Sequence, residues 1–438
     1  MSKPDSRGLA FEVLTRVETG AFADSTLGLL LSRSDLDERD RALATVFVYG
    51  SLSRQLTLDY NLQYLCGRAP ARLDRATLVA LRLGLFQLFF LDKVPAYAAV
   101  NGSVELVRRR SPMATGLVNA VLRRASREGP RRPPDGPDCE RLAIETSHPP
   151  WLVRTWLTQF GEQNALALMQ ANNQPAPTVV RSLKSRDDIV AVLNSGCPPD
   201  RPCAVSGRLA PDAIRLNGPV DCGSLATPQS EASQLVSLFL APRRGSRVLD
   251  ACAAPGGKSA HLASLVGPQG KVVAVDPAPN AAERVANTLR RCALTNVEFH
   301  AGPVENFGRL APFDFVLVDA PCSGLGTLRQ HPEIRWRRRP TDIADLAAKQ
   351  RRILDHAAAL LRPGGDLVYS TCTLSATEND ELIDGFLADN GTFRENVSSS
   401  LHPAVAALVD RQGRLRTYPH LHGTDGFFAA RLTKFGER

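Results

Sequence analysis

Two cysteines and one aspartate follow short apolar stretches of this chain, and thiols and carboxyls are groups that do covalent and acid–base chemistry. The stretch from Phe313 to Val318 is typical of a parallel strand buried on both faces, and Asp319 and Cys322 follow it. A second short strand, predicted for 366–369, precedes Cys372 in the same way. In open α/β sheets ligands bind at the carboxyl ends of the strands, so we expect these three side chains at one edge. Either cysteine alone is more typical of an inert buried thiol, but the pair beside an acid predicts a reaction centre.

A glycine-rich turn occupies residues 250–258, which read DACAAPGGK, between a predicted strand and a predicted helix. Glycine lets the backbone approach a ligand closely, and the amino end of the helix offers unpaired N–H groups. Asp276 ends the next predicted strand, where an acid suits the hydroxyls of an adenosine ribose. The pattern matches neither a phosphate loop nor GxGxxG. It fits S-adenosylmethionine and a dinucleotide equally, and a purely structural turn is also open.

The elements that must position these residues alternate between strand and helix after residue 229. This repeated β–α pattern predicts a doubly wound, mostly parallel α/β sheet. The strands are expected at 247–249, 271–275, 297–299, 313–318 and 366–369, and the helices from 259, at 281–292 and at 343–361.

The first 128 residues have apolar side chains at helical spacing, which predicts an all-α bundle. The clearest runs lie at 9–17, 43–47 and 78–88. Arginines gather at 108–110 and 123–127, and they form either a solvated helix face or a phosphate-contacting face. The prolines of 129–137 predict a linker, since they fix φ and remove donors. Residues 140–222 predict a small α+β segment that by itself indicates no chemistry.

The composition limits the class of protein. The 438 residues are too many for one ordinary core, and 43% hydrophobic with 22% charged residues is typical of a soluble globular protein. The formal net charge of +8 favours an anionic partner, although a basic protein without one stays open. Nine cysteines without metal-ligand spacing argue against a zinc site and a secreted disulfide framework. The first residues lack a signal-peptide core, and the longest apolar run, 83–91, is too short to span a bilayer, so we expect a cytoplasmic protein.

Three motifs carry a resemblance to a known family. DACAAPGGK, VDAPCSGLGTLRQHPEIRW and YSTCTLSATEND resemble the Sun/Nop family of RNA cytosine-C5 methyltransferases, and TDGFFA at 424–429 is similar to that family's last strand. DRALATVFVYGSLSR, LRLGLFQLFFLDKVPAYAAVN and GLVNAVLRR are similar to the NusB-like RNA-binding module that precedes the catalytic domain in bacterial 16S ribosomal RNA enzymes of this kind. The resemblance implies a NusB-like bundle at 1–128, a linker at 129–139, an α+β connector at 140–222 and a Rossmann-like methyltransferase domain at 223–438.

The family chemistry needs two thiols and an acid. Carbon 5 of cytosine is a poor nucleophile, and adding a thiolate to carbon 6 turns it into an enamine that can accept a methyl group. The resemblance implies Cys372 as this nucleophile, Cys322 as the group that assists product release, and Asp319 as a contact to the base. A protonated Asp319 could donate to N3, which would require a raised pKa. Lys258 either keeps Cys372 ionised or binds the cofactor carboxylate.

The resemblance also implies the cofactor and the partner. S-adenosylmethionine is the expected cofactor, and an unpaired or loop cytosine of 16S ribosomal RNA is the expected target, because the base must be unstacked. We expect a monomer with no metal and no membrane. The same chemistry on transfer RNA or another RNA, and a non-catalytic RNA-binding or antitermination factor, are the alternatives. The implied cofactor-binding residues are Cys252, Ala253, Ala254, Pro255, Gly256, Gly257, Lys258, Asp276 and Asp319.

Two further segments bear on ligands. His331, Arg335, Trp336 and the basic run 337–339 follow the Cys322 loop, and they either hold phosphates and stack on a base or form a surface loop without a role. The strand after Asp276 usually ends in Gly-Asp in the family, where the acid contacts adenine. Here the pair is Gly302-Pro303, so we expect backbone groups in place of that contact, or a weaker affinity.

Overall fold

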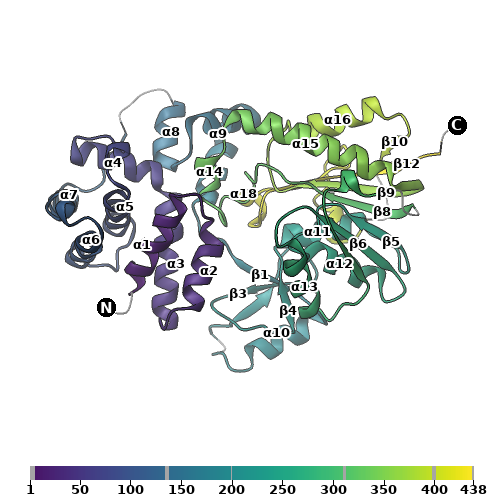
Figure 1. Ribbon diagram of the computed structural model, residues 1–438, viewed down its shortest axis with the longest axis horizontal. Helices are drawn as coiled ribbons and strands as arrows, with labels where there is room; N and C mark the ends of the chain where they lie inside the picture. Colours follow the sequence, from purple (N-terminus) through teal and green to yellow (C-terminus); the bar gives the residue numbers. More distant parts are fainter. Residues whose placement is uncertain (1–4, 134–137, 199, 309–311, 397–400, 437–438) are drawn as a thin grey trace. The chain divides into compact units, whose positions relative to one another are not determined.

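The computed structural model describes residues 5–133, 138–198, 200–308, 312–396 and 401–436, so 134–137 of the predicted linker lie outside the described residues. The chain divides into two units (Figure 1). Unit 1 contains residues 1–175 and 328–337, and unit 2 contains residues 176–327 and 338–438. The short segment that follows the Cys322 loop is therefore packed with the helices of unit 1, while the chain on both sides of it belongs to unit 2.

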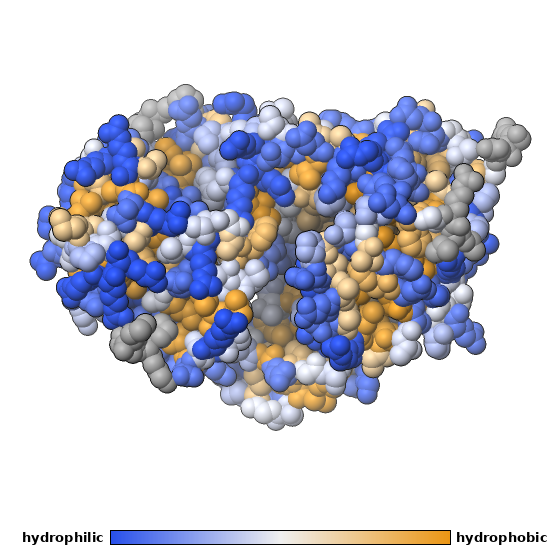
Figure 2. All heavy atoms as spheres, in the orientation of Figure 1, coloured by the Kyte–Doolittle hydropathy of each residue, from blue (hydrophilic) through white to orange (hydrophobic). Residues whose placement is uncertain are grey.

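Unit 1 is helical, as its apolar periodicity predicts. Leu9, Val13 and Val17 are buried along one face of the first helix, whereas Val46 of the third helix, which the periodicity places in the core, is 43% exposed. Hydrophilic side chains cover much of the face of this unit that Figure 2 shows. The helices are α1 (Ser6–Val17), α2 (Ala23–Ser32), α3 (Glu38–Ser53), α4 (Gln55–Cys66), α5 (Arg75–Phe90), α6 (Ala96–Arg110), α7 (Thr115–Glu128), α8 (Asp138–Thr146), α9 (Pro150–Asn172) and α14 (Ile334–Arg337), with short 3-10 turns at Pro70–Arg72 and Pro112–Ala114.

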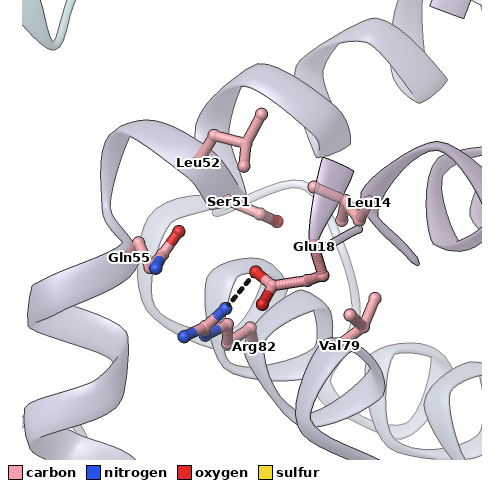
Figure 3. A pocket seen from close by; sticks show the side chains of 7 residues that line it. All are labelled: Leu14, Glu18, Ser51, Leu52, Gln55, Val79 and Arg82. Atoms are coloured by element: carbon pink, nitrogen blue, oxygen red, sulfur yellow. Dashed lines mark hydrogen bonds and ion pairs between the residues drawn. The ribbon is translucent and has the colours of Figure 1, made fainter. Parts of the chain in front are cut away.

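A buried arginine joins three helices of unit 1. Arg82 of α5 donates two hydrogen bonds of 2.7 Å to the carboxylate of Asp59 on α4, and a third of 2.7 Å to Glu18 at the end of α1. Beside it lies a cavity of about 10 Å³, which is room for about one water molecule (Figure 3). Because the guanidinium is paired, its burial is compatible with a stable bundle.

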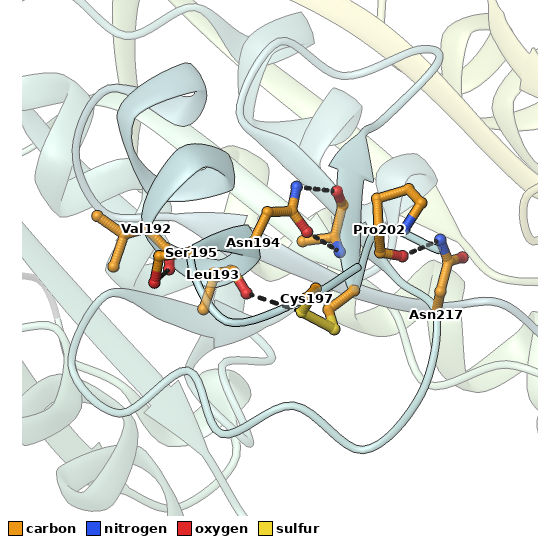
Figure 4. The surroundings of a disulfide bond; sticks show 9 residues. Val192, Leu193, Asn194, Ser195, Cys197, Pro202 and Asn217 are labelled. Carbon is orange, nitrogen blue, oxygen red and sulfur yellow. Dashed lines mark hydrogen bonds between the residues drawn. A yellow bond between two sulfur atoms is a disulfide. The ribbon is translucent and has the colours of Figure 1, made fainter. Parts of the chain in front are cut away.

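The first part of unit 2 is a four-stranded antiparallel sheet in the order β2-β3-β1-β4, formed by β1 (Thr178–Ser182), β2 (Ala204–Ser206), β3 (Ala213–Leu216) and β4 (Ala226–Pro228), with α10 (Arg186–Asn194) on it. Cys197 and Cys203 form a disulfide between α10 and β2, with their Cα atoms 6.0 Å apart (Figure 4). The cysteine spacing argued against a secreted disulfide framework and did not predict this bond. The bond forms because Asn194 pairs with both backbone groups of Ala204, at 2.8 and 2.9 Å, and so brings the two ends of this loop together.

The second part of unit 2 is an eight-stranded mixed sheet in the order β10-β12-β9-β8-β5-β6-β7, with β11 paired to β12. The pairs β7–β6, β6–β5, β5–β8 and β8–β9 are parallel, and β12 runs antiparallel to β9. The predicted doubly wound sheet is thus confirmed. Its strands are β5 (Arg247–Asp250), β6 (Lys271–Asp276), β7 (Val297–Ala301), β8 (Phe313–Asp319), β9 (Leu361–Thr371), β10 (Phe393–Glu395), β11 (Leu415–Thr417) and β12 (Phe427–Lys434).

Helices cover both faces of this sheet. Val316 and Val318 of β8 pack in one core with α15 and α16, while Phe315 and Leu317 pack in another with α11 and α12. This alternation explains the apolar run 315–318 of β8, since successive side chains there pack in cores on opposite faces of the sheet. The helices are α11 (Glu231–Leu240), α12 (Gly257–Val266), α13 (Ala281–Arg291), α15 (Pro340–Ala359), α16 (Asp380–Asp389), α17 (Pro403–Ala406) and α18 (Pro419–His422), with a 3-10 turn at Val304–Asn306.

Helix α11 links the two sheets of unit 2. Glu231 at its start is fully buried, accepts hydrogen bonds from the backbone N–H groups of Leu209 and Ala210 at 2.6 and 3.2 Å, and pairs with Arg215 of β3. The small antiparallel sheet is therefore anchored to the helix that covers one face of the mixed sheet. Among the helices of the described residues, none is both long enough and apolar enough to cross a membrane.

Candidate active site

The two cysteines singled out in the sequence lie next to each other. Cys322 follows β8 and Cys372 follows β9, and their Sγ atoms are 3.2 Å apart. The two strands are parallel neighbours, and Asp319 is directly opposite Ser370 in their register. The two loops consequently leave the sheet at the same level. The hydrogen bond with Cys372, followed by burial, raises the pKa of the Cys322 thiol well above its usual value.

Asp319 lies at the end of β8 and has a partner on each oxygen. Its Oδ2 is 2.7 Å from Nζ of Lys258, and its Oδ1 accepts a hydrogen bond of 2.8 Å from the hydroxyl of Ser370. Both oxygens of Asp319 therefore act as acceptors in these contacts. The protonated Asp319 considered from the sequence stays a prediction for the protein with a base bound.

Lys258 is held as an ammonium by this pair. Burial lowers the pKa of Lys258, but the pairing with Asp319, together with the charges of Cys372 and Asp250, outweighs burial and the net pKa is raised. Its side chain is 12% exposed. The contact with Asp319 and the electrostatic effect of Cys372 on Lys258 are compatible with both roles considered for this lysine.

The backbone of the turn from Ala253 to Lys258 has a conformation that requires glycine at one position. Gly256 has φ +100°, and a Cβ there would stand 3.2 Å from the Cα of Val285 on α13, so only glycine is free of strain. Gly257 opens α12, and a Cβ there would meet nothing within 4 Å. The amino end of α12 therefore borders open space, as a helix end that receives a ligand must.

Asp276 ties the ends of two neighbouring strands together. Its Oδ2 accepts from the backbone N–H of Ala254 at 2.9 Å, and its Oδ1 accepts from that of Ala278 at 2.8 Å. Each oxygen keeps a second lone pair, which suits two ribose hydroxyls. The glycine turn, the open helix end and this acid at the strand ends fit an adenosyl cofactor.

Two side chains next to this turn, Asp250 and Cys252, have pKa values that are raised by burial. Asp250 ends β5, is fully buried and accepts a hydrogen bond of 2.6 Å from the hydroxyl of Ser259, and burial raises the pKa of its carboxyl to about 6. Burial likewise raises the pKa of the Cys252 thiol well above its usual value. We therefore expect Cys252 to remain a neutral thiol that contacts ligands through its backbone.

The position of the family's adenine-contacting acid has a different structure here. Strand β7 ends at Ala301, Gly302 donates its N–H to the carbonyl of Asp276 at 3.0 Å, and Pro303 precedes the 3-10 turn that contains Glu305. Gly302 has φ +137°, a conformation that favours glycine. Proline provides neither a polar side chain nor an N–H group at this point.

The segment after the Cys322 loop does not present its arginines as the sequence suggested. Arg335 is fully buried, and its guanidinium donates to the carbonyls of Ser147 at 2.9 Å and Asn172 at 3.3 Å within unit 1. Trp336 donates its indole N–H to the carbonyl of Leu52 at 3.2 Å. The prediction that Arg335 holds a phosphate is therefore wrong. Its hydrogen-bonding capacity is used by backbone acceptors, which no sequence pattern reveals.

Arg338 has a different function from its neighbours. Its Nε donates to the carbonyl of Ser323 at 2.9 Å, and a terminal nitrogen donates to the carbonyl of Cys322 at 3.3 Å. This arginine thus supports the loop that carries the first thiol. In the described part of the chain, no cluster of three or more His, Cys, Asp or Glu side chains has the arrangement of a metal site.

Sequence reasoning missed the residues that follow Cys372 in the motif YSTCTLSATEND. Glu378 contacts the Cys322 loop, Asn379 accepts from the hydroxyl of Thr371 at 2.6 Å, and Asp380 pairs with Arg414 at 2.6 Å. The only signal in the sequence was that Glu378 and Asn379 are polar residues directly before a helix, although both are buried. Their partners, however, lie in other loops.

Comparison with known proteins matches this chain to one family over nearly its whole length. A family model described as 16S rRNA methyltransferase RsmB/F matches residues 237–433, the NusB family model matches 4–127, and an RsmF/B-like ferredoxin-like domain matches 148–223. A probable ribosomal RNA small subunit methyltransferase B of Bacillus subtilis is 35% identical over 100% of both chains. Ribosomal RNA small subunit methyltransferase B of Thermus thermophilus is 36% identical over 98% of this chain and 97% of its own.

A solved structure has the same fold over nearly the whole chain. The crystal structure of PH0851 has a TM-score of 0.84 and covers 99% of each chain at 24% identity, which shows the shared fold. Full-length relatives above 30% identity and the matching catalytic-domain model show the family as well. This chain belongs to the RsmB/F family of 16S rRNA methyltransferases.

Proposed function

We propose that the protein methylates carbon 5 of one cytosine in 16S ribosomal RNA through a covalent adduct between Cys372 and carbon 6 of the base, as an RsmB-like enzyme. The observation that carries the proposal is the 3.2 Å separation of the Cys322 and Cys372 sulfurs beside the Asp319 carboxylate. The names of the relatives support ribosomal RNA as the substrate. S-adenosylmethionine, the cofactor of this family of methyltransferases, supplies an electrophilic methyl group when it is bound.

The thiol pair suits the first half of the reaction. Cys322 keeps its proton, because its pKa is raised, and donates its S–H to the sulfur of Cys372. Cys372 adds to carbon 6 as a thiolate and forms the C–S bond. The electrons of the 5,6 double bond then make carbon 5 the nucleophile that takes the methyl group. Asp319 contacts the polar edge of the base, and Lys258 holds Asp319 in place.

The second half needs a base close to the adduct. Carbon 5 must lose its proton and the C–S bond to Cys372 must break, which restores the double bond and frees the thiolate. Once Cys372 is bound to carbon 6, Cys322 releases its own proton to solvent. Its thiolate, next to the sulfur that leaves, can then take up the proton of carbon 5 and so assist this release. The roles of the two thiols are therefore different although their positions are similar.

The remaining parts of the chain fit this activity. We propose that residues 1–128 bind RNA as a NusB-like module, that 129–139 link it to a connector at 140–222, and that 223–438 form the methyltransferase domain. Cys252 to Lys258, Asp276 and Asp319 are the proposed cofactor site. The exposed arginines at 108–110 are suited to contact phosphates. The protein is proposed to act as a cytoplasmic monomer on an unpaired or loop cytosine.

The test uses 16S ribosomal RNA from a strain that lacks the gene. Incubation with labelled S-adenosylmethionine should place the label in 5-methylcytidine, and Cys372→Ala should abolish it. Cys322→Ala should accumulate a protein–RNA adduct that migrates slowly in a denaturing gel. An adduct seen only with Cys372→Ala would mean that the thiol roles are reversed.

Bisulfite sequencing of total RNA with and without the gene identifies the target. A protected cytosine in 16S ribosomal RNA that disappears with the gene supports the proposal. A site in transfer RNA or another RNA would keep the chemistry and change the substrate. Loss of no site, together with no binding of S-adenosylmethionine, would favour a non-catalytic RNA-binding factor, for which Pro303 is the structural argument.

A further inference from the structure

A buried carboxylate joins the two loops that carry the thiols. Glu378 is fully buried and lies just beyond Cys372 at the start of the segment that leads into α16. Its Oε1 accepts from the backbone N–H of Ser323 at 2.8 Å and from Nε2 of Gln350 at 2.9 Å. Its Oε2 accepts from the hydroxyl of Ser323 at 2.5 Å. One side chain on the second loop thus fixes both the backbone and the hydroxyl of the residue that follows Cys322.

The residues next to the two cysteines touch each other directly. The hydroxyls of Ser323 and Thr373, which come directly after Cys322 and Cys372, are 2.6 Å apart. Gly326 donates its N–H to the carbonyl of Cys372 at 3.0 Å, so the loops are also joined through their backbones.

The network is supported from two other elements. Tyr369 of β9 donates its hydroxyl to the carbonyl of Glu378 at 2.7 Å and approaches Oε1 of Gln350 at 3.0 Å. Gln350 of α15 also donates to the carbonyl of Pro321, just before Cys322, at 3.0 Å. A buried carboxylate is strongly destabilising without hydrogen bonds, and here three donors surround it. Such a fully paired network is rigid, because any displacement leaves a buried group without a partner.

We propose that Glu378 is a positioning residue that sets the separation of the two sulfurs. It holds Ser323 against Thr373, and each of these residues is bonded to the cysteine before it in the chain. The consequence for catalysis rests on the proposed function, but the consequence for the distance between Cys322 and Cys372 does not. A misplacement of a reacting group by about 1 Å is enough to lower a rate by about a hundredfold.

The hydrogen-bond directions separate positioning from proton transfer. In Glu378→Gln the amide oxygen can take the place of Oε1 and accept from Ser323 N–H and Gln350, while the amide nitrogen donates to the Ser323 hydroxyl, which turns toward Thr373. The contacts that join the two loops survive without the charge, and only the Thr373 hydroxyl loses Ser323 as its acceptor. Glu378→Met keeps the length of the side chain but none of its acceptors, and Glu378→Asp keeps the charge but is too short to reach. A positioning role predicts that only Gln is tolerated.

The first measurement, made without RNA, is the rate of disulfide formation between Cys322 and Cys372, which depends on the distance between their sulfurs. Diamide takes two electrons and two protons from a pair of thiols, is reduced to its hydrazine and leaves an S–S bond. The rate at which the Cys322–Cys372 disulfide forms is followed on the full chain by peptide mapping with mass spectrometry. Glu378→Gln should react within about threefold of wild type, and Glu378→Met and Glu378→Asp at least about tenfold more slowly. Glu381→Met, at an exposed site of α16, is the matched control and should react like wild type.

The second measurement is the kinetics of RNA methylation. Glu378→Met should lower kcat by about a hundredfold and leave KM for RNA and the affinity for S-adenosylmethionine within about threefold, whereas Glu378→Gln should restore most of kcat. A merely structural role would lower the midpoint of thermal unfolding of the Met variant without this split. If Glu378→Met does not fold, Ser323→Ala replaces it, since it removes the hydroxyl between Glu378 and Thr373 and keeps the backbone hydrogen bond.

The outcomes distinguish this inference from the proposed function. The inference is overturned if the Met variant forms the disulfide at the wild-type rate, or if Gln is as slow as Met. Altered disulfide rates in a protein whose wild type methylates no cytosine would keep Glu378 as the residue that positions the thiols and reject the proposed function.

Discussion

The ammonium of Lys258 lies 2.7 Å from Oδ2 of Asp319, and this contact joins the glycine turn after β5 to the end of β8. The hydroxyl of Ser370, at the same level on β9, holds the other oxygen of Asp319 at 2.8 Å. Three neighbouring strands are therefore connected through one carboxylate. The proposed cofactor turn and the proposed contact to the base cannot move independently.

Asp319→Asn should change the pH dependence of cofactor binding. Asp319 raises the pKa of Lys258 against the effect of burial, so its removal lowers that pKa and the ammonium is lost at lower pH. In wild type the raised pKa keeps Lys258 charged up to about pH 10. In Asp319→Asn a fall of S-adenosylmethionine affinity with rising pH should set in at lower pH, as measured by titration calorimetry from pH 7 to 10. Ser370→Ala keeps the charge of Asp319 and should leave the profile in place. An unchanged profile in Asp319→Asn would exclude Lys258 from cofactor binding.

Arg338→Met should impair the step that depends on Cys322. The substitution removes the donors to the carbonyls of Cys322 and Ser323, and the loop that carries the first thiol becomes less well ordered. We expect methylation to slow by about tenfold and the RNA adduct of Cys372 to become detectable. Arg411→Met, at an exposed position, is the control. Slower methylation without any adduct would place Arg338 before the release step.

Arg335→Met should destabilise unit 1 and leave the protein's contacts with RNA phosphates unchanged. The buried guanidinium satisfies several backbone carbonyls, and its loss should lower the free energy of unfolding by about 3 kcal/mol. All three tryptophans of the chain lie in unit 1, so their fluorescence in a urea titration reports this change. The salt dependence of RNA affinity should be that of wild type. A shallower salt dependence in Arg335→Met would mean that Arg335 does contact an RNA phosphate, against what the structure indicates.

The stability of unit 1 should fall in acid because of His148. This side chain is fully buried, its Nδ1 is 2.8 Å from the carbonyl of Thr146, and burial lowers its pKa well below the usual value. Below about pH 6.5 the unfolded chain binds a proton that the folded protein excludes, so the free energy of unfolding falls as the pH falls. The contribution is up to about 1.4 kcal/mol per pH unit.

His148→Asn tests this dependence, because its amide can donate to Thr146 but does not titrate. The slope of unfolding free energy against pH, from tryptophan fluorescence, should decrease by about half a proton on average between pH 7 and 5.5, and by close to one proton at pH 5.5. His356→Asn, at an exposed site, should keep the wild-type slope. Equal slopes for wild type and His148→Asn would assign the acid sensitivity to other groups.

Local sequence patterns predict helices and strands well where apolar residues recur with a clear period or form an unbroken run. The apolar run 313–318 corresponds to β8, and the periodicity of 9–17 corresponds to α1, because burial on a fixed face leaves a period in the sequence. Boundaries were less accurate. Helix α15 begins at Pro340 rather than residue 343, since proline is well suited to the first turn of a helix. Val46 fits the helical period and is nevertheless exposed.

The sequence by itself determined that two thiols and an acid stand at the carboxyl ends of parallel strands, because strand type and strand end are local properties. Only the tertiary structure decided that β8 and β9 are neighbours and that their register brings Cys322 and Cys372 to 3.2 Å. It also decided that Glu378 meets Ser323, and that Arg335 is used by backbone carbonyls. These contacts join residues far apart in the chain, and a side chain's hydrogen-bond partner across that distance leaves no period in the sequence from which it can be read.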